Sequence, residues 1–248
     1  MSTPKDHPRY KSLMVREHLA EMVDKGLVNE TGLISHGRGE AFDYLMGEHT
    51  VEPALKAEKA AAAYLLRAKN PVVCANGNAT VLDPKGLIAL SEAVSAKLEV
   101  NIYHRTEERM RLLIDYLEQN GAKKVYGRAP DAKIPGLSSD RALCTKEGIF
   151  DCDVIIVPIE DGDRAEALVA MGKVVISIDL NPLSRTSKTA TVSISDDMVR
   201  ALANILRFVG ELKGKDKEIE DTISGFSNKE NRKETVECIC SSLMSEFD

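Results

Sequence analysis

Several features that would assign a protein to a class at once are missing from this sequence. No apolar run approaches the ~20 residues that a membrane-spanning helix needs. The first residues also contain no apolar core of the kind found in signal peptides. The sequence therefore predicts a soluble, cytoplasmic protein that has no contact with a membrane.

An excess of basic residues is missing as well. The 33 lysine and arginine residues are outnumbered by 39 aspartate and glutamate residues, which gives a formal net charge of −6. Proteins that bind nucleic acid over a broad surface need a basic face. The charge balance therefore argues against a nucleic-acid partner, and any phosphate binding must be confined to a local site.

Cysteines are few, and their spacing forms no pattern. They are Cys74, Cys144, Cys152, Cys238 and Cys240, of which only the last two lie close together. An odd number without the paired spacing of zinc sites favours reduced thiols over disulfides or a cysteine-bound metal. This agrees with a cytoplasmic protein.

Standard catalytic signatures are also missing. The chain contains no GxxxxGK[ST], GxGxxG, GxSxG or HExxH. It therefore has no common phosphate loop, dinucleotide fingerprint, hydrolase nucleophile elbow or zinc-binding helix. A nucleotide site in this protein must be built from other residues.

One segment of the C-terminal half predicts a strand, a helix and a second strand in succession. Residues 154–157 and 174–178 are short β-branched runs, and residues 164–171 between them have apolar side chains at helical spacing. Ligands of parallel sheets bind beyond the carboxyl ends of the strands. The two polar loops that follow these strands, residues 160–163 and 179–186, are therefore the first site candidates.

The same alternation extends over residues 70–212 and predicts an α/β fold with a mostly parallel sheet and flanking helices. Further strands are expected at residues 71–75, 98–104, 124–126 and 191–194, and helices at residues 106–120 and 198–212.

Residues 1–69 are expected to form a helical N-terminal region of the same domain, so that residues 1–212 are a single unit. Residues 213–248 are charged and poor in apolar side chains. We predict that they form a tail or a loosely docked helix with no catalytic role.

The first two predicted strands of the core end in polar residues. Asn76 and Asn78 follow the first, where their amides offer both donors and acceptors, although an ordinary Asn-Gly turn is the structural alternative. His104 and Arg105 follow the second and suit an acid/base group and a phosphate clamp. Here the alternative is a helix that Thr106 caps, with Arg109 exposed on its first turn.

The two later strands also end in polar residues. Asp161 and its acidic neighbours suit Mg²⁺ held through water, although Asp163 and Glu166 have the spacing of a capping pair. The loop of residues 179–186 is harder to explain structurally, because an acid at a strand end suits a ribose hydroxyl or a metal. Its asparagine, serine, arginine and threonine add donors that suit a nucleotide.

Two arginines of the N-terminal region suit a polyphosphate, because each is a fixed cation with a planar fork of donors. Arg16 lies in a helical pattern, where a solvated helix residue is the simpler interpretation. Arg38 lies between Gly37 and Gly39, which we expect to let the backbone curve around an anion.

Seven segments of the chain, taken in order, resemble the archaeal 4-phosphopantoate–β-alanine ligases, also called phosphopantothenate synthetases. The resemblance covers residues 7–212 and leaves the charged tail outside. The segments are HPRYKSLMVRE, GLISHGRGEAFDYLMGE, ANGNATVL, LEVNIYHRTEER, GLSSDRA, VPIEDGDRAEALVAMGK and ISIDLNPLSRTS.

The resemblance implies an enzyme of coenzyme A biosynthesis with a Rossmann-like core that forms homodimers. Such an enzyme joins the carboxylate of 4-phosphopantoate to the amine of β-alanine through an acyl-adenylate, consuming ATP and releasing AMP and diphosphate. We add Mg²⁺ as the expected cofactor.

The resemblance also implies which residues contact ATP, and its motifs include residues to which we assign roles. The implied ATP contacts are Arg16, Arg38, Asp179, Leu180, Asn181, Arg185 and Thr186. We assign Asn76 and Asn78 to substrate binding and His104, Arg105 and Asp161 to catalysis, with His104 or Asp161 as the base that deprotonates the amine.

Two other functions remain open at this stage. A nucleotide-sensing regulatory module would use the same crevice without turnover, but it has no need of the polar groups near His104 and Asp161. A ligase that passes through an acyl-phosphate would release ADP instead of AMP. Conversion of ATP to AMP with and without the two other substrates tests the first possibility, and the identity of the nucleotide product tests the second.

Overall fold

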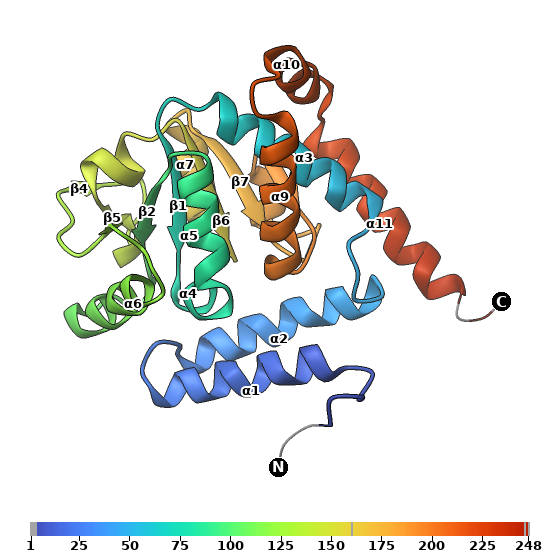
Figure 1. The fold of residues 1–248 in the computed structure, drawn as a ribbon, viewed down its shortest axis with the longest axis horizontal. Helices are drawn as coiled ribbons and strands as arrows, with labels where there is room; N and C mark the ends of the chain where they lie inside the picture. Colours follow the sequence, from blue (N-terminus) through green and yellow to red (C-terminus); the bar gives the residue numbers. More distant parts are fainter. Residues whose placement is uncertain (1–3, 160, 246, 248) are drawn as a thin grey trace.

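The structure is a computed structural model that describes residues 4–159, 161–245 and 247. The predicted helical N-terminal region is confirmed as α1 (Tyr10–Asp24), α2 (Glu30–Leu45) and α3 (Glu52–Arg67). Helices α1 and α2 lie side by side beneath the carboxyl ends of the sheet, whereas α3 runs along the opposite side of the molecule (Figure 1).

The predicted parallel sheet is confirmed as well. Its six strands are β1 (Pro71–Ala75), β2 (Lys97–Val100), β3 (Val125–Tyr126), β6 (Val154–Pro158), β7 (Val174–Ile178) and β8 (Val192–Ile194). All neighbours pair in parallel, in the order β3-β2-β1-β6-β7-β8. This is the Rossmann order, and the direction of the crossovers reverses between β1 and β6.

Helices cover both faces of this sheet. One face packs against α3, α5 (Pro84–Ala93), α6 (Glu107–Gln119) and α9 (Met198–Leu212). The other packs against α7 (Gly162–Ala170) and the segment between β3 and β6. Successive β1 residues divide between the two cores, Val73 facing the first and Val72 the second, because side chains alternate along a strand.

The segment between β3 and β6 forms a small substructure that the sequence pattern does not predict. It contains an antiparallel pair, β4 (Ala132–Lys133) and β5 (Leu143–Cys144), and lies against the sheet. The buried carboxylate of Glu99 in β2 holds it by accepting hydrogen bonds from the amides of Thr145 (2.7 Å) and Ile149 (2.8 Å).

The C-terminal segment is docked more closely than the sequence indicates. It forms α10 (Asp216–Gly225) and α11 (Asn228–Ser245), and α11 lies against α3 (Figure 1). Asn231 is 5% exposed and donates to the carbonyl oxygen of Pro53 at 2.8 Å. Polar side chains that bind main-chain groups dock this helix, and a pattern based on apolar residues does not detect them.

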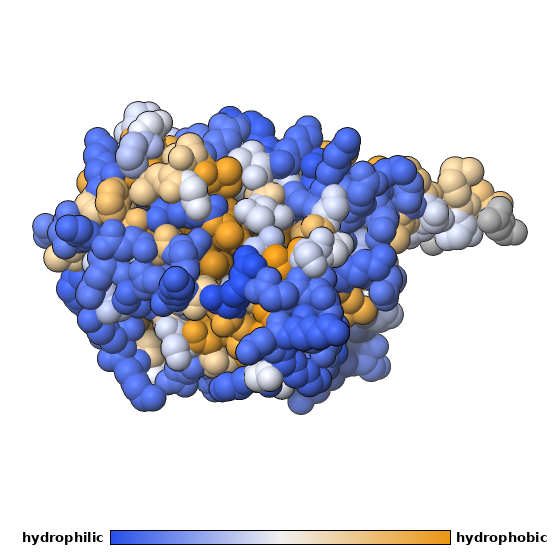
Figure 2. Space-filling view, turned by 90° about the horizontal axis from the view of Figure 1, so that it is seen from above, coloured by the Kyte–Doolittle hydropathy of each residue, from blue (hydrophilic) through white to orange (hydrophobic). Residues whose placement is uncertain are grey.

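The last turns of α11 project beyond the body of the molecule (Figures 1 and 2). Leu243, Met244 and Phe247 are exposed there, the last of them to 85%. None of the helices in the described part of the chain is both long and apolar enough to cross a membrane.

Candidate active site

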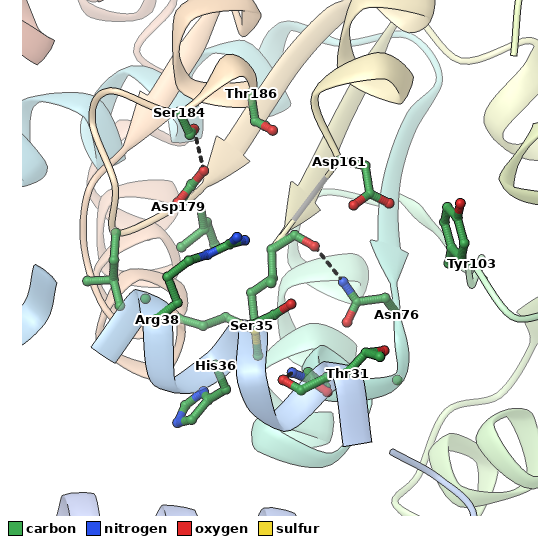
Figure 3. A pocket seen from close by; sticks show the side chains of 18 of the residues that line it. Thr31, Ser35, His36, Arg38, Asn76, Tyr103, Asp161, Asp179, Ser184 and Thr186 are labelled. Carbon is green, nitrogen blue, oxygen red and sulfur yellow. Dashed lines mark hydrogen bonds between the residues drawn. The ribbon is translucent and has the colours of Figure 1, made fainter. Parts of the chain in front are cut away.

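A cavity of about 850 Å³ opens at the carboxyl ends of the strands, where β1 and β6 adjoin and α2 forms one wall (Figure 3). This is the position at which parallel sheets bind ligands. Most of the predicted site residues line it. They are Arg38, Asn76, Asn78, His104, Asp161, Asp179, Leu180, Asn181, Arg185 and Thr186.

Polar contacts fix α2 in place beside the cavity. Arg200 of α9 binds Asp43 of α2 and also Asp196, which follows β8. At the other end of α2, Asn78 donates to the carbonyl oxygen of Gly32 at 2.8 Å. Helix α2 is therefore tied to both halves of the sheet.

The loop after β7 is folded around its first residue. One carboxylate oxygen of Asp179 accepts from the amide of Asn181 (3.0 Å) and the other from the hydroxyl of Ser184 (2.5 Å). Burial raises the pKa of Asp179, and these two bonds and the charge of Arg38 oppose that effect. The closed turn presents Arg185 and the buried Thr186 to the cavity.

Arg38 reaches the cavity from a helix and not from a curved loop. Gly37 and Gly39 both lie within α2, so the expectation that they let the backbone curve around an anion is wrong. The helical hydrogen bonds and the packing of α2 outweigh the conformational freedom of the two glycines. The Arg38 side chain points across the cavity towards Asp179 (Figure 3). Among the described residues it makes no side-chain hydrogen bond or ion pair.

Asn76 and Asn78 lie at the junction of β1 and β6 with α2, and their amides are engaged by the main chain. The Asn76 amide donates to the carbonyl oxygens of Pro158 (2.8 Å) and Ile159 (2.9 Å). Its own oxygen accepts from the amide of Ala79 and so caps the short helix α4 (Gly77–Leu82). Asn76 is therefore the N-cap of a helix and not part of an ordinary Asn-Gly turn, and it shapes the crevice.

The two acid/base candidates line the cavity in different environments. His104 is exposed, and its ring meets the edge of Tyr103 at 5.0 Å between centroids. Asp161 accepts from Nη1 of Arg141 at 2.8 Å and is the N-cap residue of α7. The capping pair considered for this helix does not form. Glu160, part of the predicted acidic cluster, lies outside the described residues.

Two of the predicted site residues do not line the cavity. Arg16 pairs with Glu40 (Nε to Oε2, 2.9 Å), on the opposite side of α2. Arg105 donates to the carbonyl oxygens of Gly127 (2.6 Å) and Arg128 (3.3 Å), just beyond β3. Arg105 is next to a cavity-lining residue in the sequence and Arg16 lies on the helix beside α2, but other partners bind the guanidinium groups of both.

Among the described residues, four charged ones that line the cavity were not predicted: Arg109, Arg141, Asp196 and Asp197. Asp196 and Asp197 follow β8 after Ser195, so the same rule about strand ends would have found them. Arg141 comes from the substructure between β3 and β6; it lies in the segment GLSSDRA, which carries part of the family resemblance, but the rule about strand ends does not reach it. Arg109, expected to be exposed on a first helical turn, is half-buried.

Comparison with known proteins gives consistent results. The family model described as phosphopantothenate/pantothenate synthetase matches residues 53–242. The matched region therefore includes α10 and most of α11, so the expectation that the similarity ends at residue 212 is wrong.

Individual relatives match nearly the whole chain. It is 50% identical over 234 residues to the 4-phosphopantoate--beta-alanine ligase of Methanosarcina mazei, which covers 94% of this chain and 92% of that protein. It is 51% identical over 226 residues to the protein of the same name from Methanospirillum hungatei (91% and 90%). For the Thermococcus kodakarensis protein of that name, identity is 48% over 214 residues (86% and 82%).

Proposed function

We propose, since the chain belongs to the phosphopantothenate/pantothenate synthetase family, that it condenses 4-phosphopantoate with β-alanine to 4′-phosphopantothenate in coenzyme A biosynthesis. ATP is consumed in this reaction, and AMP and diphosphate are released. The observation that carries the proposal is that one cavity at the β1–β6 junction collects both a nucleotide-type loop after β7 and the acid/base candidates.

ATP binds along the β7 side of the cavity in this proposal. The turn after β7 offers the main chain of Leu180 and Asn181, and Arg38 faces it from α2. Arg185 lies at the start of α8 (Arg185–Thr189) and pairs with Glu166 through Nη2 and Oε2 at 3.1 Å. Arg38 and Arg185 are the cations that we assign to the triphosphate.

A carboxylate reacts with an amine only after one of its oxygens becomes a good leaving group. In the proposed reaction, a carboxylate oxygen of 4-phosphopantoate attacks the α-phosphorus of ATP, and diphosphate leaves. Both reactants are anions, so fixed positive charge at the cavity lowers the barrier by stabilising the charge that builds up. Arg38, Arg141 and Arg185 supply this charge, and the buried Arg141 is held in place by its ion pair with Asp161.

The second half of the reaction needs a base. The amine of β-alanine gives up a proton and attacks the acyl carbon, the new amide bond forms, and AMP leaves. His104 is the base that we favour, because its ring has no side-chain hydrogen bond to the described residues, whereas Arg141 occupies an oxygen of Asp161. Arg141 and Asp161 then position the acyl group.

The proposal includes Mg²⁺, which in nucleotide-using enzymes is usually held by one or two carboxylates, phosphate oxygens and water. The described residues contain no group of three or more ligands that would bind a metal without a substrate. Asp161 and Asp197 both line the cavity, and one of these carboxylates would hold the metal together with phosphate oxygens of ATP. Mg²⁺ would neutralise the charge of the departing diphosphate.

The proposed reaction is tested by the products formed from ATP. We expect AMP and diphosphate at steady state only when 4-phosphopantoate and β-alanine are both present. Formation of ADP would identify an acyl-phosphate ligase. Binding of ATP without any turnover in the complete mixture would identify a regulatory module.

We also propose that the protein forms a homodimer. This rests on the family resemblance and on the exposed apolar side chains at the end of α11, which a second copy would cover. Sedimentation equilibrium should give a mass near twice 27.2 kDa. A mass of 27.2 kDa at micromolar concentration would contradict the proposal.

A further inference from the structure

Arg109 of α6 is the half-buried cation of the cavity to which the reaction described above assigns no role. We infer that its guanidinium binds the phosphate group of the acid substrate, at the β1 side of the cavity and away from Arg38. This inference rests on the proposed function. It assigns the residue that distinguishes a phosphorylated substrate from one that lacks the phosphate.

The charges along the cavity support this assignment. Arg141 is paired with Asp161 and Arg185 with Glu166, and Arg38 faces Asp179. Arg109 has no carboxylate partner among the described residues, and both of its side-chain hydrogen bonds go to carbonyl oxygens. Burial lowers its pKa, as expected for a cation without a counter-ion.

Two main-chain groups hold the Arg109 guanidinium in position. Nη1 donates to the carbonyl oxygen of His104 at 2.8 Å, and Nη2 donates to that of Leu27 at 3.4 Å. The same Nη2 lies 3.3 Å from where a Cβ on Gly77 would be. The chain therefore approaches the guanidinium closely on several sides. A cation fixed in this way loses little conformational freedom when an anion binds.

An unpaired, half-buried cation at this position is energetically unfavourable, and a bound anion removes this penalty. A charge taken out of water is unfavourable unless it is paired. Its Nε is buried and has no hydrogen-bond partner in the part of the chain that the structure describes. Two hydrogen bonds engage only part of the five N–H groups of a guanidinium, which leaves donors for a phosphate.

The chemistry of the substrate fits the separation of the two cations. The reacting carboxylate of 4-phosphopantoate must meet the α-phosphate of ATP, which the proposed function places near Arg38 and β7. The substrate's own phosphate is at the other end of a short carbon chain. It therefore extends past β6 towards β1, where Arg109 lies beside Gly77 and His104.

The test compares Arg109→Gln with Arg111→Gln, a matched control two residues along the same helix. Arg111 is exposed, pairs with Asp115 and does not line the cavity. We expect Arg109→Gln to raise the KM for 4-phosphopantoate by about 10- to 150-fold, the effect of losing one charge-assisted contact. In Arg109→Gln, the KM values for ATP and for unphosphorylated pantoate should stay within about twofold of wild type. In Arg111→Gln, the KM values for 4-phosphopantoate, ATP and pantoate should all stay within that range.

Other outcomes would overturn the inference. Equal increases of KM for 4-phosphopantoate and for pantoate would show that Arg109 only clamps the main chain. An increase of KM for ATP alone would place it at the nucleotide. If Arg109→Gln does not fold, Arg109→Lys keeps the charge and should show a smaller increase, again confined to the phosphorylated substrate. Wild-type enzyme that does not use 4-phosphopantoate would refute the proposed function instead.

Discussion

Asn76 holds the main chain of Ile159 in a strained conformation at the point where the sheet's crossovers reverse. Its Nδ2 donates to the carbonyl oxygen of Ile159 at 2.9 Å, and Ile159 has a φ of 53°. β-Branched residues rarely adopt this left-handed conformation, which costs about 1–3 kcal/mol. Such strain typically occurs where a chain is shaped for a ligand, and Ile159 lines the cavity.

Replacing Asn76 by Asp should therefore affect both stability and activity. The carboxylate keeps the acceptor for Ala79 but places a negative oxygen beside the carbonyl oxygens of Pro158 and Ile159. We expect a loss of about 2–4 kcal/mol in unfolding free energy and a decrease of at least tenfold in kcat/KM. Urea unfolding and steady-state kinetics measure the two effects.

Asn120→Asp is the matched control, because Asn120 donates to the carbonyl oxygen of Tyr116 at the end of α6, away from the cavity. It should lower stability slightly and leave kcat/KM unchanged. Wild-type kcat/KM in Asn76→Asp would mean that the conformation of Ile159 has no bearing on catalysis.

Arg38→Lys should weaken the use of ATP without destabilising the fold. The lysine keeps the charge but loses the planar fork that binds two phosphate oxygens. We expect kcat/KM for ATP to fall by roughly 10- to 150-fold, and further in Arg38→Ala. The melting temperature should not change, because the side chain is exposed. Wild-type kcat/KM for ATP in both variants would remove Arg38 from the nucleotide site.

Deletion of the C-terminal helices should impair the enzyme, contrary to what the charged sequence suggests. Asn228 donates to the carbonyl oxygens of Ser187 (3.0 Å) and Ala190 (2.8 Å), and Arg232 donates to that of Pro182 (2.7 Å). These contacts support the loop that carries Arg185.

Asn228→Ala tests this contribution without truncation. Loss of the Asn228 side-chain amide leaves main-chain groups unpaired and should lower the free energy of unfolding by about 1–3 kcal/mol. We also expect a several-fold higher KM for ATP. Lys229→Ala, at the neighbouring exposed residue, is the control. Unchanged stability and KM in Asn228→Ala would support the prediction from the sequence that the C-terminal segment is at most loosely docked and has no catalytic role.

Glu58 should make the stability of the protein depend on pH. Its side chain is fully buried in α3, and no lysine or arginine among the described residues forms an ion pair with it. Burial and the charge of Asp196 raise its pKa from 4.5 to about 9. Between these values the folded state binds more protons than the unfolded state. The contribution of Glu58 to stability is therefore complete below pH 4.5 and is lost as the pH rises towards 9.

Glu58→Gln removes this titration. The free energy of unfolding of the variant, minus that of wild type, should increase by up to about 1.4 kcal/mol for each pH unit between pH 5 and pH 8. Urea unfolding at several pH values measures it, with the exposed Glu118→Gln as the control. An advantage that does not change with pH would show that Glu58 is ionised in the folded protein.

Sequence reasoning identified the order of strands and helices correctly where the pattern is local. The runs 71–75 and 174–178 became β1 and β7 with the predicted bounds, and Thr106 caps α6 as expected. These features depend on β-branched runs, helical spacing and caps, which act over a few residues. The rule that ligands bind at strand ends then correctly placed the predicted strand-end residues at one cavity, with the exception of Arg105.

The sequence could not show which polar groups would already be satisfied. Asn76 and Arg105 both follow strands, but the first ties β1 to β6 and the second supports the chain after β3. A side chain's partners depend on segments that lie far away in sequence, and these are brought near only when the sheet assembles.

The sequence by itself thus determined the α/β class, the parallel strands and the family. Only the tertiary structure decided that Arg38 points into the cavity from a helix, that Arg109 lies half-buried without a carboxylate partner among the described residues, and that polar contacts dock α11. The physical reason is that propensity and apolar spacing are local properties, whereas burial and charge compensation depend on the whole fold.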